Sequence, residues 1–241
     1  MPITFHLFGF AHWSVLAPIP LLAGLLALLQ RKLLRGTRLI RWLLAGLLVF
    51  SAASYYGHFA WQGEALFPRH MPLELCDLSL ILTIVVLLRF RPALFDIVYY
   101  WALAGATMAL LTPNIGEQTT LFLAVVFFAD HGLTVTAVLY LVWSRQARPR
   151  PGSVWRALLA VNVAAVVVGA FDFAYKTDYM FLRQKPATAS LLDMFGSWPW
   201  YILACEGAGL VLFALLYWPF WRRADEEESR SDKCGDAQRM M

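Results

Sequence analysis

The sequence contains few charged residues for its length. Asp, Glu, Lys and Arg make up 15% of its 241 residues, whereas hydrophobic residues make up 60%. A soluble domain of this size usually carries about 25% charged residues. The deficit in charge excludes an ordinary soluble fold and favours a membrane protein, whose immediate partners are membrane lipids.

Cysteine is scarce, and a cleavable leader is not evident. Cys76, Cys205 and Cys234 form an odd set of three, which does not build a disulfide framework. No basic cluster precedes the first apolar stretch, so we expect that stretch to be retained as a span. The net charge of +4 does not indicate nucleic-acid binding, because the basic residues lie in short loops beside apolar runs.

Long apolar runs dominate what remains. A spanning helix needs about 20 mostly apolar residues, and seven segments approach that length. The sequence therefore predicts an all-α, polytopic membrane bundle over residues 1–222, with Pro18 and Pro20 kinking the first span. The polar tail at 223–241 is predicted to be disordered. The predicted spans are approximately 12–30, 42–61, 73–88, 93–111, 120–143, 154–174 and 198–221.

The distribution of basic residues predicts the topology. Lys and Arg concentrate in the first, third and fifth loops and directly after the last span. The positive-inside rule then predicts an external N-terminus and a cytoplasmic C-terminus, in the cytoplasmic (inner) membrane. The sixth loop departs from this trend because it carries Lys176, Arg183 and Lys185.

With this topology, the polar residues of the spans gather at one level. Ionisable residues at membrane depth are costly, so they usually face a cavity or a partner. We therefore expect an outward-facing polar cavity inside the bundle. Asp96 is instead expected to pair at the surface with Arg89 and Arg91. The residues predicted in the outer half are His58, Glu74, Cys76, Asp77, Ser79, Asp130, His131, Asp172 and Glu206.

A cysteine and a histidine that share a cavity can form a nucleophile–base pair. His131 would remove the thiol proton of Cys76, and the thiolate would attack an acyl carbonyl. Two neighbouring carboxylates oppose formation of the thiolate unless a cation compensates them. Buried free cysteines are also common as inert core residues, and that interpretation stays open. The residues assigned a supporting role are Asp77, Asp130, Asp172, Glu206 and His58.

The same side chains include metal-ligand types, but their spacing does not support a metal centre. Zinc sites commonly show closely spaced pairs of His or Cys, and neither HxxxH nor CxxC spacing occurs among these residues. We therefore predict neither a metal nor another cofactor.

An ordered series of motifs resembles a known family. The series begins with Pro72-Leu73-Glu74-Leu75-Cys76-Asp77-Leu78-Ser79. Three short motifs follow, which are Leu103-Ala104-Gly105-Ala106, Leu111-Thr112-Pro113 and Asp130-His131-Gly132. The series ends with Tyr179-Met180-Phe181-Leu182-Arg183 and Lys185-Pro186, then Ala189-Ser190-Leu191-Leu192-Asp193, then Trp198-Pro199-Trp200-Tyr201. Over nearly the whole chain this resembles the YwaF-like bacterial integral membrane family. That family is similar to a eukaryotic multi-span protein described as an ether-phospholipid acyltransferase. By motif, the resemblance implies that Cys76 and His131 are the catalytic pair. This chain departs from the family pattern at two positions, because Glu74 stands where the family often has a histidine and Asp178 where it often has an asparagine.

The leading hypothesis is therefore a lipid acyltransferase with a possible phospholipid substrate. Arg183 and Lys185 would bind the lipid phosphate on the outer side. A transporter or channel is the first alternative, in which the intramembrane carboxylates would be ion or proton sites. A non-enzymatic membrane assembly protein is the second. The sequence leaves the oligomeric state, the acyl donor and the acceptor open.

Overall fold

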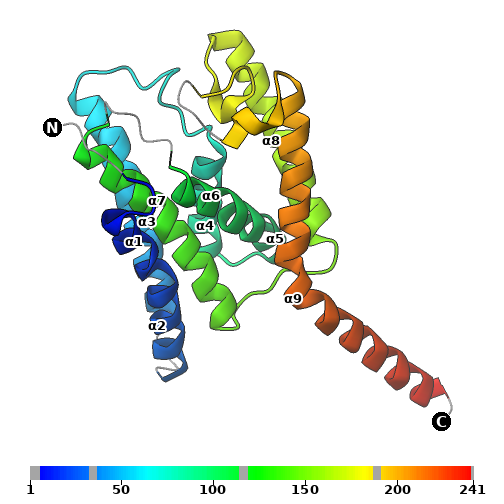
Figure 1. The fold of residues 1–241 in the computed structure, drawn as a ribbon. Helices are drawn as coiled ribbons and strands as arrows, with labels where there is room; N and C mark the ends of the chain where they lie inside the picture. Colours follow the sequence, from blue (N-terminus) through cyan, green and yellow to red (C-terminus); the bar gives the residue numbers. More distant parts are fainter. Residues whose placement is uncertain (1–5, 33–36, 114–118, 187–190, 240–241) are drawn as a thin grey trace.

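The computed structural model describes residues 6–32, 37–113, 119–186 and 191–239. The described residues are helical or irregular and contain no strand, which confirms the predicted all-α class. The elements are α1 (Phe10–Leu16), α2 (Pro18–Lys32), α3 (Thr37–Trp61), α4 (Leu75–Leu88), α5 (Pro92–Tyr100), η1 (Trp101–Ala106), α6 (Thr107–Leu111), α7 (Leu121–Trp143), α8 (Ser153–Tyr175), η2 (Tyr179–Phe181), η3 (Leu191–Phe195) and α9 (Trp200–Arg239) (Figure 1).

In the described part of the chain, six helical segments are long and apolar enough to cross a membrane. The predicted third span is instead the 14-residue helix α4, which begins at Leu75 rather than at residue 73. The predicted topology and the predicted disorder of 223–241 stay predictions. The six segments are Phe10–Lys32, Arg38–Trp61, Pro92–Leu111, Leu121–Trp143, Ser153–Tyr175 and Trp200–Trp221.

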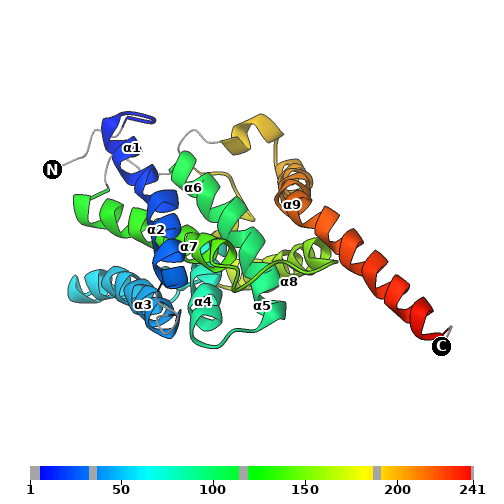
Figure 2. The ribbon, with the colours of Figure 1, turned by 90° about the horizontal axis from the view of Figure 1, so that it is seen from below.

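The first span is divided, as the two prolines predict. α1 ends at Leu16 and α2 begins at Pro18, with Ala17 between them. Proline lacks the backbone N–H that a continuous helix would need, so a break is favoured here. The break turns α1 across the end of α7, where Figure 2 shows it beside α6.

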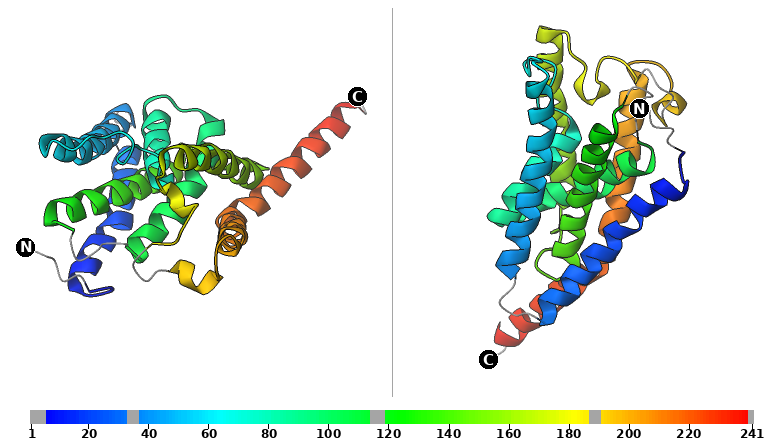
Figure 3. Two further views of the ribbon diagram at one scale, coloured as in Figure 1. Left: turned by 90° about the horizontal axis from the view of Figure 1, so that it is seen from above. Right: turned by 90° about the vertical axis from the view of Figure 1, so that its left-hand side faces the viewer.

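Helix α7 forms the centre of the bundle. It contacts α2, α3, α4 and η1, and Ala137, Val138, Tyr140 and Leu141 along it have no solvent-accessible surface. In contrast, α8 and α9 carry many exposed apolar side chains, such as Val166 and Leu203. Such surfaces suit the lipid-facing side of a membrane protein. Seen from above in Figure 3, α9 stands apart from α7 and is joined to the bundle mainly through α8, η1 and η3.

The middle of the fourth predicted span is a π-helix. Residues Trp101–Ala106 form η1, between α5 and α6. π-helical turns are rare and often occur at functional sites. The η1 segment packs on α4 and α7, and a Cβ atom added at Gly105 would lie 3.9 Å from the side chain of Leu75. The small residues of Leu103-Ala104-Gly105-Ala106 therefore let η1 approach the first residue of α4 closely.

The end of the bundle where α4 ends is held by buried polar contacts. Asp96 is fully buried, and its carboxylate accepts hydrogen bonds from the guanidinium groups of Arg150, at 2.7 and 2.9 Å, and Arg156, at 3.0 Å. The expected surface pairing of Asp96 with Arg89 and Arg91 is therefore wrong. Burial of Asp96 requires partners that can satisfy its charge, and the loop before α8 supplies Arg150 while the first turn of α8 supplies Arg156.

Arg41 of α3 holds the C-terminus of α4 in the same region. Its guanidinium donates to the carbonyl groups of Leu87, at 2.7 Å, and Val86, at 2.8 Å. The last carbonyl groups of a helix lack intrahelical partners and carry partial negative charge, so a cation stabilises them. The position of α4 along the bundle is therefore fixed at this end by a charged contact.

Candidate functional site

The opposite end of the bundle, at the top of Figure 1, brings together the segment before α4 and the segment after α8. Three acidic residues organise this end, and each one contacts the backbone of a neighbouring segment. They are Glu74, Asp77 and Asp172.

Glu74 and Asp77 form a capping box at the start of α4. The side chain of Glu74 accepts from the backbone N–H of Asp77, and Asp77 Oδ2 accepts from the backbone N–H of Glu74 at 3.2 Å. This arrangement satisfies N–H groups that a helix start leaves free. Glu74 Oε2 also accepts from the backbone N–H of Met180 at 2.8 Å. The first turn of α4 is thus tied to the segment that follows α8.

Asp172 and Tyr179 extend this connection. Asp172 is fully buried, and its Oδ1 atom accepts from Thr177 Oγ1 at 2.6 Å and from the backbone N–H of Tyr179 at 3.1 Å. The Tyr179 hydroxyl donates to the carbonyl of Pro68 at 2.7 Å and accepts from the backbone N–H of Met71 at 2.8 Å. Asp172 therefore fixes a tyrosine that links the two segments.

Cys76 lies in the first turn of α4 and is half-buried. Ser79 and Thr83 follow Cys76 by three and seven residues along α4 and so share its face. Both are fully buried, and Thr83 Oγ1 donates to the Ser79 carbonyl at 2.7 Å. A helix N-terminus favours negative charge, but the burial of the thiol and the adjacent carboxylates of Asp77 and Glu74 oppose a thiolate at this position. The thiol therefore sits at the boundary between the polar end and the interior of the bundle.

His131 lies in the middle of α7 and is 7% exposed. Its Nδ1 atom is 2.7 Å from the carbonyl oxygen of Phe127, and its ring lies 4.2 Å from the Phe127 ring. Because a carbonyl only accepts, this contact requires a proton on Nδ1 and leaves Nε2 as the acceptor. Nε2 is buried and makes no hydrogen bond within the described residues. The imidazole is thus held as a base with a free lone pair.

Helices α4 and α7, which carry Cys76 and His131, pack against each other. On α7, Thr134 Oγ1 donates to the backbone carbonyl of Asp130 at 2.6 Å. Nε2 of His131 makes no hydrogen bond to the thiol of Cys76. The structure therefore places the proposed pair on neighbouring helices and does not bring the two side chains into contact.

Other predicted site residues lie in separate contacts. His58 stacks on Phe122, with the rings 4.9 Å apart, and its Nε2 atom is 3.1 Å from Gln62 Nε2. Glu206 of α9 accepts from Asn162 of α8 at 2.6 Å. These contacts support helix packing and give neither residue a direct contact with Cys76 or His131. Within the described ranges, no group of three or more His, Cys, Asp or Glu side chains is placed to hold a metal ion.

Arg183 and Lys185 both contact the polypeptide around them. Arg183 Nη1 donates to the carbonyl of Thr177 at 3.0 Å. Lys185 Nζ lies 3.7 Å from the Asp193 carboxylate and 5.6 Å from the centre of the Tyr201 ring. Tyr201 in turn donates from its hydroxyl to the carbonyl of Phe181. The two basic residues therefore order the loop between α8 and α9 and leave part of their surface at its exposed side.

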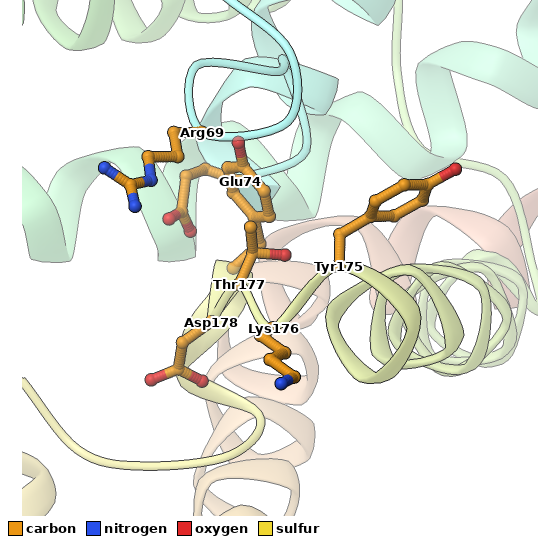
Figure 4. A pocket seen from close by; sticks show the side chains of 7 residues that line it. Arg69, Glu74, Tyr175, Lys176, Thr177 and Asp178 are labelled. Carbon is orange, nitrogen blue, oxygen red and sulfur yellow. The ribbon is translucent and has the colours of Figure 1, made fainter.

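An open pocket of about 490 Å³ lies at this end of the bundle. It is not lined by Cys76 or His131, so it is not the cavity that the sequence predicts around that pair. Figure 4 shows Arg69 and Glu74 from the segment before α4 facing Lys176 and Asp178 from the segment after α8. The pocket is lined by Arg69, Glu74, Tyr175, Lys176, Thr177, Asp178 and Tyr179.

Burial changes the acidity of one pocket residue, Glu74, which lies directly before α4 and outside the spanning segments. Burial raises the pKa of Glu74 from its ordinary value of 4.5 to about 7, while the hydrogen bond from Met180 opposes this rise. The nearby carboxylates of Asp77, Asp172 and Asp178 raise it further. Glu74 therefore titrates near neutral pH.

Sequence reasoning missed Arg69 and Tyr179 as parts of this end, and it noted Lys176 only as one of three basic residues in the sixth loop. Tyr179 carried a signal, because it opens one of the ordered motifs. Arg69 carried none, since it is a single basic residue in its loop. Their role depends on two segments that are more than a hundred residues apart in the chain.

Comparison with known proteins assigns the chain to a family. Residues 7–217 match the TMEM164 family. An uncharacterised protein of Treponema pallidum (strain Nichols) is 24% identical over 222 residues, which cover 88% of this chain and 89% of that protein. No solved structure matches. The matched region contains the polar end described above and the apolar segments as far as residue 217 of the last one, and the chain is an integral membrane protein that belongs to the TMEM164 family.

Proposed function

We propose that this protein is a lipid acyltransferase in which Cys76 carries the acyl group and His131 is the general base. The observation that carries the proposal is the state of the imidazole. The bond from Nδ1 to the Phe127 carbonyl leaves Nε2 as a buried acceptor without a partner, on the helix that contacts α4. A buried polar atom without a partner is costly, and such atoms often mark reactive positions.

The chemistry needs two transfers. In the first, Nε2 of His131 takes the thiol proton of Cys76, and the sulfur forms a bond to the carbonyl carbon of a lipid ester. The ester C–O bond then breaks, and the leaving oxygen takes the proton from the imidazolium, which leaves a thioester on Cys76. In the second transfer, the hydroxyl of an acceptor attacks the thioester, gives its proton to His131 and releases the thiol.

The thiol and the imidazole have to approach each other when substrate enters. Catalytic hydrogen bonds are often long or absent before a substrate is bound. Cys76 lies in the first turn of α4, whose neighbours are α3, α7 and η1. The carboxylate of Asp77 is held in the capping box, so it does not compete as an acceptor for the thiol proton. The supporting roles for Asp130, Asp172, Glu206 and His58 are to keep the helices in place.

The membrane setting gives the proposal its substrate. Arg183 and Lys185 would attract a lipid phosphate to the loop between α8 and α9, on the external side of the cytoplasmic membrane. The similarity to the YwaF-like family and to an ether-phospholipid acyltransferase points to the same chemistry. The donor would then be a phospholipid that reaches Cys76 from the bilayer.

The test is transfer of a labelled acyl chain. The full chain, purified in lipid, is incubated with a phospholipid that carries a labelled acyl group, and label on the protein is measured. We expect label that hydroxylamine releases, that is lost in Cys76→Ser and that is retained in the matched control Cys205→Ser. Absence of label with several lipid donors, or equal loss in both variants, would contradict the proposal.

Transport is the second candidate, and one observation favours it. Helices α4 and α7 pack against each other and carry one carboxylate each, Asp77 and Asp130, and carboxylates at membrane depth are typical of proton or cation pathways. Uptake of a solute or cation by vesicles containing the protein, abolished in Asp77→Asn and in Asp130→Asn but not in Cys76→Ser, would favour transport. No effect of any of these changes on labelling or uptake would favour a non-enzymatic assembly protein.

A further inference from the structure

The pocket between the segments before α4 and after α8 contains charges of both signs. Arg69 and Lys176 supply two cations, and neither has an ion pair or a hydrogen bond among the described residues. The carboxylates of the pocket are already engaged by backbone N–H groups. Glu74 accepts from Met180, and Asp178 Oδ1 accepts from the backbone N–H groups of Arg183, at 2.8 Å, and Gln184, at 3.3 Å.

Both cations line the pocket and have no partner among the described residues, so they are available to an anion from outside the chain. Lys176 follows α8 with a left-handed backbone conformation, φ 57° and ψ 36°. Arg69 comes from the segment that Tyr179 fixes through Pro68 and Met71. An arginine offers a planar fork and a lysine a compact charge, and both are common ligands of phosphate.

The carboxylates make a purely anionic ligand unfavourable. Glu74 and Asp178 would repel a second negative group, whereas they would attract an ammonium group next to the phosphate. Tyr175, Thr177 and Tyr179 complete the lining. A pocket of about 490 Å³ is within the size range of small-ligand sites.

We propose that this pocket binds a phosphate ester that carries an ammonium group, with the phosphate at Arg69 and Lys176 and the ammonium at Glu74 and Asp178. The pocket lies at the end of the membrane-spanning helices, so the zwitterionic headgroup of a phospholipid can reach it. A soluble phosphate ester with the same two groups has the same chemistry, and the experiment below separates the two sources.

The location also connects the pocket to the proposed chemistry. Glu74 lines the pocket, and Cys76 follows it by two residues in the first turn of α4. A lipid held by its headgroup would therefore lie at the same end of the bundle as the thiol. This last step rests on the proposed acyl transfer, whereas binding of the zwitterion does not.

Binding is measured on the full-length protein in detergent by titration with glycerophosphoethanolamine, glycerophosphoglycerol and inorganic phosphate. We expect the first probe to bind at least about tenfold more tightly than the other two, a difference of about 1.4 kcal/mol. Arg69→Gln and Lys176→Gln should each weaken it by a similar factor without loss of thermal stability, because neither side chain has an internal partner. The matched control is Arg91→Gln, an exposed arginine at the opposite end of the bundle.

The source of the ligand is tested by the same measurements with nanodiscs that contain phosphatidylethanolamine or phosphatidylglycerol. Competition of the soluble probe only by phosphatidylethanolamine nanodiscs would identify the lipid as the ligand, and absence of competition would identify a soluble ester. Both results support the pocket. Equal binding of all three soluble probes, or no change in Arg69→Gln and Lys176→Gln relative to Arg91→Gln, would overturn it.

Cys76→Ser separates this proposal from the proposed function. We expect the variant to bind glycerophosphoethanolamine as the native protein does. Binding of the probe without acyl label in the native protein would support the pocket and contradict the proposed acyltransferase. Acyl label on Cys76, together with binding that Arg69→Gln does not weaken, would contradict the pocket and leave the acyltransferase supported.

Discussion

The Oδ1 atom of Asp172 accepts a hydrogen bond from the backbone N–H of Tyr179, whose hydroxyl bonds to both Pro68 and Met71. One carboxylate at the end of α8 thereby determines how the segment before α4 is held. The start of α4, with Cys76 in its first turn, depends on this link.

Tyr179→Phe tests the link. The change leaves the Pro68 carbonyl and the Met71 N–H without their partner, and an unsatisfied buried group costs about 1–3 kcal/mol. We expect a lower thermal midpoint in detergent. Tyr175→Phe is the matched control, because Tyr175 is 47% exposed and should change stability little. Equal midpoints for both variants would show that the hydroxyl of Tyr179 is not a stabilising contact.

The buried ion cluster at the other end makes a prediction about charge. Asp96 is fully buried, so removal of both Arg150 and Arg156 as alanines leaves an uncompensated carboxylate, at a cost of about 3–5 kcal/mol. Addition of Asp96→Asn to that double variant should restore part of the stability, because the buried charge is then absent. Thermal unfolding measures both steps, with the exposed Arg91→Ala as the control. Failure of Asp96→Asn to recover any stability would mean that the charge is not the cause.

The proposed base can be tested separately from the nucleophile. His131→Ala removes the acceptor Nε2, and loss of a general base usually slows a reaction by about 10²–10⁴-fold. We expect that decrease in the rate of acyl labelling, while Cys76 remains available to a thiol reagent. His58→Ala is the control, since His58 packs on Phe122. A labelling rate in His131→Ala equal to that of the control would exclude the assigned role.

Glu74 gives stability a defined pH dependence. Burial raises its pKa in the folded protein from 4.5 to about 7, so the folded state holds the proton more tightly than the unfolded state does. The stabilisation that the protonated Glu74 gives the folded state is therefore fully present below about pH 4.5, and it is lost as the pH rises through about 7.

The measurement is the thermal midpoint between pH 5 and 8, taken for the native chain and for Glu74→Gln. We expect the native midpoint to fall more steeply over this interval than that of the variant, which lacks the titrating group. Parallel curves would show that Glu74 keeps its ordinary pKa in the folded protein.

The elements of the bundle were largely predictable, because apolar length and proline act locally. The break between α1 and α2 follows from Pro18 and Pro20. The length of α4 was less predictable, since the apolar run before Arg89 is short and its capping box at Glu74 becomes evident only with the helix in place. The π-helix η1 has no signal in hydrophobic periodicity.

The candidate site was less predictable because its contacts join distant residues. Asp96 meets Arg150 across 54 positions, and nearer arginines offered an equally plausible pairing. Tyr179 meets Met71 across 108 positions. Sequence spacing placed Cys76 and His131 at a similar depth, but it did not show that the Phe127 carbonyl selects the tautomer of the imidazole.

The short length of α4 has a consequence for the surrounding bilayer. A helix of 14 residues extends about 21 Å, whereas the hydrocarbon layer is about 30 Å thick. Arg41 anchors the far end of α4, so the missing length, about 9 Å by these figures, lies on the Cys76 side. If α4 crosses the hydrocarbon layer, we therefore expect its first turn, with Cys76, to lie below the outer ends of the longer neighbouring spans.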